Sequence, residues 1–295
     1  MYSLEELKKL SNDALANSDY QKAEEYLKKI LENNPNSYEA LNNLGMVYFV
    51  TNRQDEAYEY FKKAYDLNPK LLEANQNLGS YYLYKGDIDK SEEFFLKALQ
   101  IDPNNFNTYH NLSTLYLNSE QFSKAKKSLE KLLQIDSDNF QASFMLGSIF
   151  LNLKEYYPAI ANFLYTLNIN KDMHNARMGL AEAYYRLGRY KAALRELEIL
   201  FKVMPNMVSP YIKSALISIE MGDNKNAIPY LEKALQIDRT NLDTMEMLAI
   251  LYEENGNKEK AEELYQEMLI IDPESKVAIE GIERLEELNK RLSQT

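Results

Sequence analysis

The chain has 295 residues, of which 45% are hydrophobic and 27% charged, a balance typical of folded, water-soluble proteins rather than disordered ones. Its formal net charge of −11 disfavours a nucleic-acid partner, because binding to phosphates relies on a surplus of Lys and Arg. The sequence has no Cys, which excludes disulfides and a thiol nucleophile.

The first ten residues, MYSLEELKKL, contain four charged side chains, and no apolar segment follows them. A secretory signal is therefore not predicted. Nowhere do about 18 apolar residues run together, so no membrane span is expected either. From these features we predict a cytoplasmic protein without a membrane partner.

The sequence repeats with a period of 34 residues, counted from Leu4 as position 1. Position 7 is Leu in seven of eight units, position 20 is Ala in seven, and position 32 is Pro in five. A fixed period of this length is the signature of a repeat architecture. The eight predicted units are residues 4–37, 38–71, 72–105, 106–139, 140–173, 174–207, 208–241 and 242–275.

The residue pattern of each unit predicts two helices. In the second unit, Leu41, Leu44 and Tyr48 have the spacing of one helical face, and a later stripe containing Phe61 marks another helix. Glycine at position 15, as at Gly86 in the third unit, ends the first helix, and proline at position 32 ends the second. No segment has the alternation of a strand, so the fold class is all-α.

This pattern of a large residue, Leu, Gly, Tyr, then Ala, Phe, Ala and Pro resembles the tetratricopeptide repeat family. The matching residues of the second unit are Leu41, Leu44, Gly45, Tyr48, Ala57, Phe61, Ala64 and Pro69. The resemblance covers residues 4–275 and implies a right-handed superhelical α-solenoid of eight tandem helix-turn-helix repeats. Residues 276–295 resemble the C-terminal capping helix of that family, and we expect Ile279, Ile282 and Leu285 to face inward.

The sequence contains no recognisable catalytic or metal-binding motif. Its two histidines, His110 and His174, lie 64 residues apart without Cys partners, which disfavours a zinc site. The glycines are explained by helix packing and helix ends, which leaves no phosphate-binding loop. We therefore expect no enzyme activity, no cofactor and no metal.

Positions 2, 6, 9 and 13 of each first helix project to the side opposite its packing stripe, at 100° per residue. In the family that this chain resembles, that side lines a concave groove where peptides bind. Position 6 is Asn43, Asn77 and Asn111 in three successive units. Either these amides bind the backbone of an extended peptide, or they brace neighbouring repeats.

The first units also resemble part of the carboxylate clamp of heat-shock co-chaperones. Lys8, Asn12 and Asn43 match the residues that the clamp takes from its first two repeats. The third unit has Glu73 and Asn77 where the clamp needs Lys and Arg. Glu73 would repel a terminal carboxylate and the bidentate donor is missing, so a complete clamp is not predicted.

Later units place apolar residues along the predicted groove, partly explained by packing between repeats. An apolar patch that stays exposed would be a binding site, for example for an amphipathic helix. The candidates are Phe144, Met145, Met178, Tyr185, Ile212, Leu216 and Ile219. The last part of the predicted groove is acidic and would favour a basic end of the ligand. Its acidic residues are Asp243, Glu246, Glu253 and Glu254.

Together these features predict a non-enzymatic scaffold that binds a protein or peptide segment in its groove, as a monomer or weak homo-oligomer. Two alternatives remain: a structural subunit that uses its convex face and ends, and a regulatory partner of an enzyme.

An extended solenoid makes a prediction about size. Small-angle scattering should give a radius of gyration well above the ~19 Å expected of a compact globule of this length, because each repeat contacts only its neighbours. A compact value would rule out the open solenoid.

Overall fold

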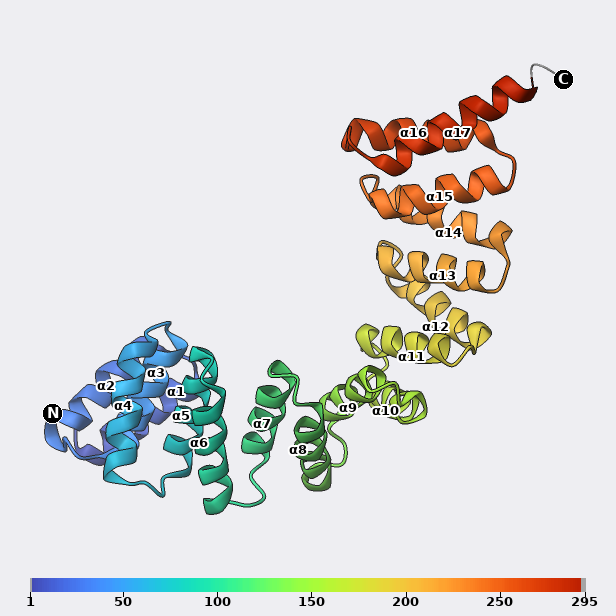
Figure 1. The fold of residues 1–295 in the computed structure, drawn as a ribbon. Helices are drawn as coiled ribbons and strands as arrows, with labels where there is room; N and C mark the ends of the chain where they lie inside the picture. The colour runs from blue at the N-terminus through green and yellow to red at the C-terminus, as the bar shows by residue number, and fades with distance from the viewer. Residues whose placement is uncertain (1, 293–295) are drawn as a thin grey trace. The chain divides into compact units, whose positions relative to one another are not determined.

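A computed structural model describes residues 2–292, and within that range every regular element is an α-helix (Figure 1). The helices form eight successive pairs and a final single helix, so the predicted all-α repeat fold with a capping helix is confirmed. The helices are α1 (Leu4–Ala16), α2 (Tyr20–Asn33), α3 (Tyr38–Val50), α4 (Gln54–Leu67), α5 (Leu72–Lys85), α6 (Ile88–Ile101), α7 (Phe106–Asn118), α8 (Phe122–Ile135), α9 (Phe140–Asn152), α10 (Tyr156–Ile169), α11 (His174–Arg186), α12 (Tyr190–Val203), α13 (Val208–Glu220), α14 (Asn224–Ile237), α15 (Leu242–Glu254), α16 (Lys258–Ile271) and α17 (Lys276–Leu292).

The chain divides into two compact units, Met1–Ala142 and Ser143–Thr295. In the first unit, α1 pairs with α2, α3 with α4, α5 with α6 and α7 with α8, and each pair packs on the next. The second unit follows the same scheme from α10 to α17. Such packing between sequential neighbours is how repeat proteins build a continuous core. In the range that the structure describes, no helix combines the length and hydrophobicity needed to cross a bilayer.

Every turn between the two helices of a repeat contains one residue in the left-handed region, at position 15. Four repeats have glycine there, with φ between 69° and 77°. The other four use Ser18, Asn52, Glu120 and Lys154, with φ between 56° and 65°. The geometry of the turn is therefore imposed by the packing of the two helices, even where the residue has a Cβ that disfavours it.

The two helices of a repeat are tightly packed where position 8 meets position 24. A Cβ added to Gly45 would lie 2.6 Å from a ring carbon of Phe61, and one added to Gly79 would lie 2.6 Å from Phe95. Gly147 and Phe163 have the same relation at 2.7 Å. In these repeats the aromatic ring fills the space that a side chain at position 8 would occupy.

Repeats without this glycine have a smaller residue at position 24. The pairs are Ser11 with Leu27, Ser113 with Leu129, Ala181 with Leu197 and Ala215 with Leu231. Glycine therefore accompanies Phe, while Ser or Ala accompanies Leu, as expected when one closed volume must be filled. The eighth repeat, with Ala249 and Tyr265, departs from this rule because its ring instead lies against Gly281 of α17, 2.5 Å from an added Cβ.

The capping helix α17 is rotated relative to the sequence-based prediction. Its buried face contains Ala278 and Leu285, with Ile282 packed against the same core. Ile279, expected to face inward, is 40% exposed, so that part of the prediction was wrong. The close contact between Tyr265 and Gly281 explains the rotation, because it fixes Gly281 at the centre of the buried face and turns Ile279 away.

The paired sizes at positions 8 and 24 predict a coupled mutational effect. Gly45→Ala should destabilise the protein by about 1–3 kcal/mol, because overpacking against Phe61 exceeds the gain in helix propensity. Adding Phe61→Leu should recover part of that loss, with a coupling energy of roughly 0.5–3 kcal/mol in urea unfolding. Ala181→Gly, which opposes Leu197, is the matched control and should cost only about 1 kcal/mol. Strictly additive effects of Gly45→Ala and Phe61→Leu would contradict the shared volume.

Candidate functional site

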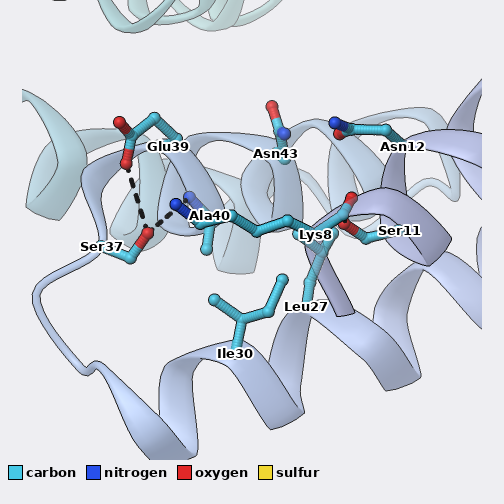
Figure 2. Close-up of a pocket in the computed structure, with 9 residues that line it drawn as sticks. All are labelled: Lys8, Ser11, Asn12, Leu27, Ile30, Ser37, Glu39, Ala40 and Asn43. Atoms are coloured by element: carbon cyan, nitrogen blue, oxygen red, sulfur yellow. Dashed lines mark hydrogen bonds between the residues drawn. The ribbon is translucent and has the colours of Figure 1, made fainter. Parts of the chain in front are cut away.

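A hollow of about 220 Å³ opens between α1, α2 and α3 in the first compact unit (Figure 2). Its floor is formed by Leu27 and Ile30 of α2, which are almost fully buried. Lys8 and Asn12 come from α1, and Asn43 comes from α3. The structure therefore brings the three residues that resemble part of a carboxylate clamp to one site.

The hydroxyl groups at this hollow already have partners. Ser11 Oγ donates to the carbonyl oxygen of Lys8 at 2.8 Å. Ser37 Oγ accepts from the backbone of α3 and donates to Glu39 at 3.3 Å. Within residues 2–292, the side chains of Lys8, Asn12 and Asn43 have no hydrogen bond or ion pair, so they can bind a ligand.

The charge at the hollow is mixed. Lys8 supplies an ammonium group, Asn12 and Asn43 supply neutral amides, and the carboxylate of Glu39 lines the same opening. An amide can donate to a carbonyl and accept from an N–H, which suits a peptide backbone. A free carboxylate would meet one cation and one anion here, so the site differs from a full clamp.

The asparagines at position 6 are half-buried and do not share one environment. Asn77 Nδ2 donates to Oδ1 of the buried Asn42, in the preceding repeat, at 2.9 Å. Beside it, Gln76 Nε2 donates to Oδ1 of Asn105, the N-cap residue of α7, at 2.7 Å. Asn111 has no hydrogen bond from its side chain in the part of the chain that the structure describes. Bracing between repeats therefore occupies Asn77, and leaves Asn43 and Asn111 available.

The predicted apolar groove residues of the second compact unit are mostly packed. Phe144 lies 6.0 Å from the ring of Phe163, and Tyr185 lies 5.9 Å from the ring of Tyr190. Met178 packs on the core formed around α11 and α12, and Ile212 is half-buried. Leu216 differs, because 39% of its surface is exposed. Four of these five residues therefore contribute to repeat packing, while Leu216 is open to solvent.

An ion-pair cluster at α11 and α13 was not foreseen from the sequence. Glu182 accepts from Lys213 of the next repeat and from Arg186 at 2.6 Å. Burial raises the pKa of Glu182, but these two hydrogen bonds outweigh burial and leave the pKa below its usual value. The carboxylate is therefore ionised at neutral pH. Glu182 is at position 9 of its repeat and Lys213 is at position 6 of the next. Since adjacent repeats bring these two positions together, their opposite charges were the only sequence signal for the ion pair.

The acidic end of the predicted groove is partly neutralised. Glu253 is paired with Arg284 of the capping helix at 3.2 Å, and Glu254 accepts from Asn224 at 2.8 Å. Among the described residues, no cluster of three or more His, Cys, Asp or Glu side chains is arranged to hold a metal ion. Glu253 therefore contacts the capping helix, and Glu254 contacts the preceding repeat.

Comparison with known families identifies the repeat. Profiles of the tetratricopeptide repeat match residues 8–71, 72–105, 94–127 and 218–279. A profile of subunit 3 of the anaphase-promoting complex, or cyclosome, matches residues 120–199. No curated protein matches the sequence.

Solved structures give the same assignment of fold. The chain is similar to a tetratricopeptide repeat protein from Parabacteroides merdae, with 20% identity, a TM-score of 0.56, and coverage of 84% of this chain and 98% of that one. It is similar to Cut9-Hcn1 of the anaphase-promoting complex (18%, TM-score 0.55, 83% and 48% covered). It is also similar to YrrB, described as having an unusual peptide-binding site (20%, TM-score 0.53, 64% and 97% covered).

The unequal environments of the asparagines make a prediction about stability. Asn77→Ala should destabilise the protein by about 1–3 kcal/mol, because it leaves the buried Oδ1 of Asn42 without its donor. Asn111→Ala is the matched control and should change stability by less than about 1 kcal/mol, helped by the helix propensity of Ala. Thermal unfolding followed by circular dichroism measures both variants. Equal melting temperatures for the two would show that the amide pair does not brace the repeats.

Proposed function

This chain belongs to the tetratricopeptide repeat family, and from that premise we propose that it is a non-catalytic scaffold that binds an extended peptide segment of a partner protein at the α1–α3 hollow. The family is one of repeat scaffolds that typically mediate interactions between proteins. The choice of site and of an extended peptide is our proposal.

The observation that carries the proposal is the set of three uncommitted polar side chains above an apolar floor. Among the described residues no side chain is hydrogen-bonded to those of Lys8, Asn12 and Asn43, while Leu27 and Ile30 form the base of the hollow. A site of this kind accepts an apolar side chain below and backbone polar groups above, as ligand pockets in proteins usually do.

The geometry of an extended peptide matches this arrangement. Neighbouring helices in a repeat array lie about 10 Å apart and a strand rises about 3.3 Å per residue, so one amide meets about every third residue. Asn43 would then contact the backbone at the hollow, and Asn111 would contact it two repeats further on. Lys8 would donate a hydrogen bond to a carbonyl or acidic group of the ligand. Glu39 disfavours a bare terminal carboxylate, because the two negative charges would repel each other.

The proposal is tested with a random peptide library displayed on phage and selected on the immobilised full chain. Peptides that are recovered are then titrated calorimetrically against three variants. Asn43→Ala should weaken binding by about 0.5–1.5 kcal/mol, roughly 2- to 12-fold, for the hydrogen bonds lost. Lys8→Ala should weaken binding as well.

Lys9→Ala is the control, because Lys9 is the adjacent exposed lysine of α1 and does not line the hollow. Its affinity should equal that of the wild type. Selected peptides that bind all three variants as tightly as the wild type would refute the hollow as the peptide site.

A second candidate is a structural subunit of a larger assembly. The match of residues 120–199 to a profile of an anaphase-promoting complex subunit favours it, because that region lies outside the α1–α3 hollow. The two candidates differ in one measurement. Capture of a native complex should survive Lys8→Ala combined with Asn43→Ala if the chain is a subunit, and should fail if peptide binding at the hollow holds the complex together.

A further inference from the structure

The outward side of the second helix in each repeat is formed by positions 18, 22, 25, 26 and 29. In seven of the eight repeats these five positions hold at least three charged residues. In α10 they hold none. We call the side of α10 formed by these five positions the α10 outer face. It consists of Tyr157, Ala161, Leu164, Tyr165 and Asn168.

The α10 outer face is exposed and plays no part in the core of its repeat. Tyr157 is 64% exposed and Leu164 is 46% exposed, while the opposite side of the helix is buried through Ala159 and Phe163. The five residues follow the i, i+4, i+7, i+8, i+11 spacing of one continuous helical stripe. An uncharged stripe of three turns on an otherwise charged set of helices is the kind of surface that binds another protein.

Uncompensated positive charge lies beside this face. The guanidinium of Arg189 lies 5.6 Å from the centre of the Tyr157 ring. Arg189, Lys191 and Arg195 line a hollow of about 480 Å³ at the start of α12, and no carboxylate lines it. Within the described ranges none of the three has an ion-pair partner. The sixth repeat, residues 174–207, has six Lys and Arg but only three Glu, in a chain whose net charge is −11.

The chain also carries a surface of the opposite kind. On α16 the same five positions hold Glu259, Glu263, Gln266, Glu267 and Ile270, which we call the α16 outer face. Ile270 is 82% exposed, and the three carboxylates have no ion pair within residues 2–292. The eighth repeat, residues 242–275, contains ten Asp and Glu against two Lys. This face therefore combines an exposed aliphatic side chain with unpaired negative charge.

The two faces belong to the same compact unit but are separated along it. From α12 to α16 the packing passes through α13, α14 and α15 in succession. α10 packs on α11, and α16 packs on α15 and α17, so the two faces do not meet within this unit. Contact between the faces therefore requires two molecules.

We propose that the α10 outer face, with the basic hollow beside it, docks the α16 outer face of a second copy of this chain. Leu164 and Tyr157 pack against Ile270 of the second copy, while Arg189, Lys191 and Arg195 meet its glutamates. A pair of molecules joined in this way keeps one free α10 outer face and one free α16 outer face, so the contact is head-to-tail and continues as a chain of copies. One helix on another buries less than the ~1,200 Å² of a stable complex, so association is weak and decreases with salt.

Sedimentation velocity of the full chain over a range of concentrations tests the proposal. The average mass should rise above the 34.4 kDa of the monomer as concentration increases, and fall back at high salt. Leu164→Glu should abolish this rise. Leu96→Glu is the matched control, because Leu96 occupies the same position in α6 and is 44% exposed, so that variant should associate like the wild type.

Charge reversal distinguishes this contact from others. Arg189→Glu with Arg195→Glu should abolish association, and so should Glu263→Lys with Glu267→Lys. An equimolar mixture of the two double variants should associate again, because each then offers the face that the other needs. Circular dichroism confirms that every variant is folded.

Three outcomes overturn the proposal. The wild type stays at 34.4 kDa at every concentration, the mixture fails to associate, or the α16 double variant associates as the wild type does. The last result would mean that two α10 outer faces meet each other.

Discussion

The structure depends on one closed volume between the two helices of each repeat. Where position 8 is glycine, the ring at position 24 lies directly against the helix backbone, as Phe61 does at Gly45. Where position 8 is Ser or Ala, Leu fills the remaining space in every repeat except the eighth, which has Tyr265. Different pairs of residues therefore fill the corresponding place in different repeats. In the first two repeats this packing lies beside the hollow that Lys8, Asn12 and Asn43 line.

Much of the fold could be predicted because the period fixes both the helices and their turns. The positions of the groove residues were harder to predict, since a helical projection treats each helix as isolated. In the folded chain the next repeat covers part of that side, which is why Met178 and Tyr185 are half-buried. The same omission hid the ion pair between Glu182 and Lys213, which requires two repeats in contact. Ile279 was misplaced because the contact of Gly281 with Tyr265 rotates α17.

Polar contacts between repeats determine which groups remain free for partners. Tyr48 donates to Glu24 of the preceding repeat at 3.2 Å, and Tyr116 donates to Glu92 at 2.8 Å. In the fifth to seventh repeats these paired positions hold side chains such as Ile160 and Leu194, which cannot form such a bond. The surfaces that we assign to partners use side chains that this internal pairing does not engage. Within residues 2–292, amide side chains at the α1–α3 hollow have no hydrogen-bond partner, and some charged side chains of α12 and α16 have no ion-pair partner.

The glycine contacts also bear on how such a gene can gain or lose repeats. Each pair of positions 8 and 24 lies within one repeat, so unequal recombination that moves a whole repeat keeps both partners together. Phe163 and Tyr265 are different, because each ring also lies against a glycine of the following element, Gly179 and Gly281. Deleting or exchanging the sixth repeat or α17 alone would bring another side chain against the ring. At these two glycine contacts the fifth repeat is therefore matched to the sixth, and the eighth repeat to its cap.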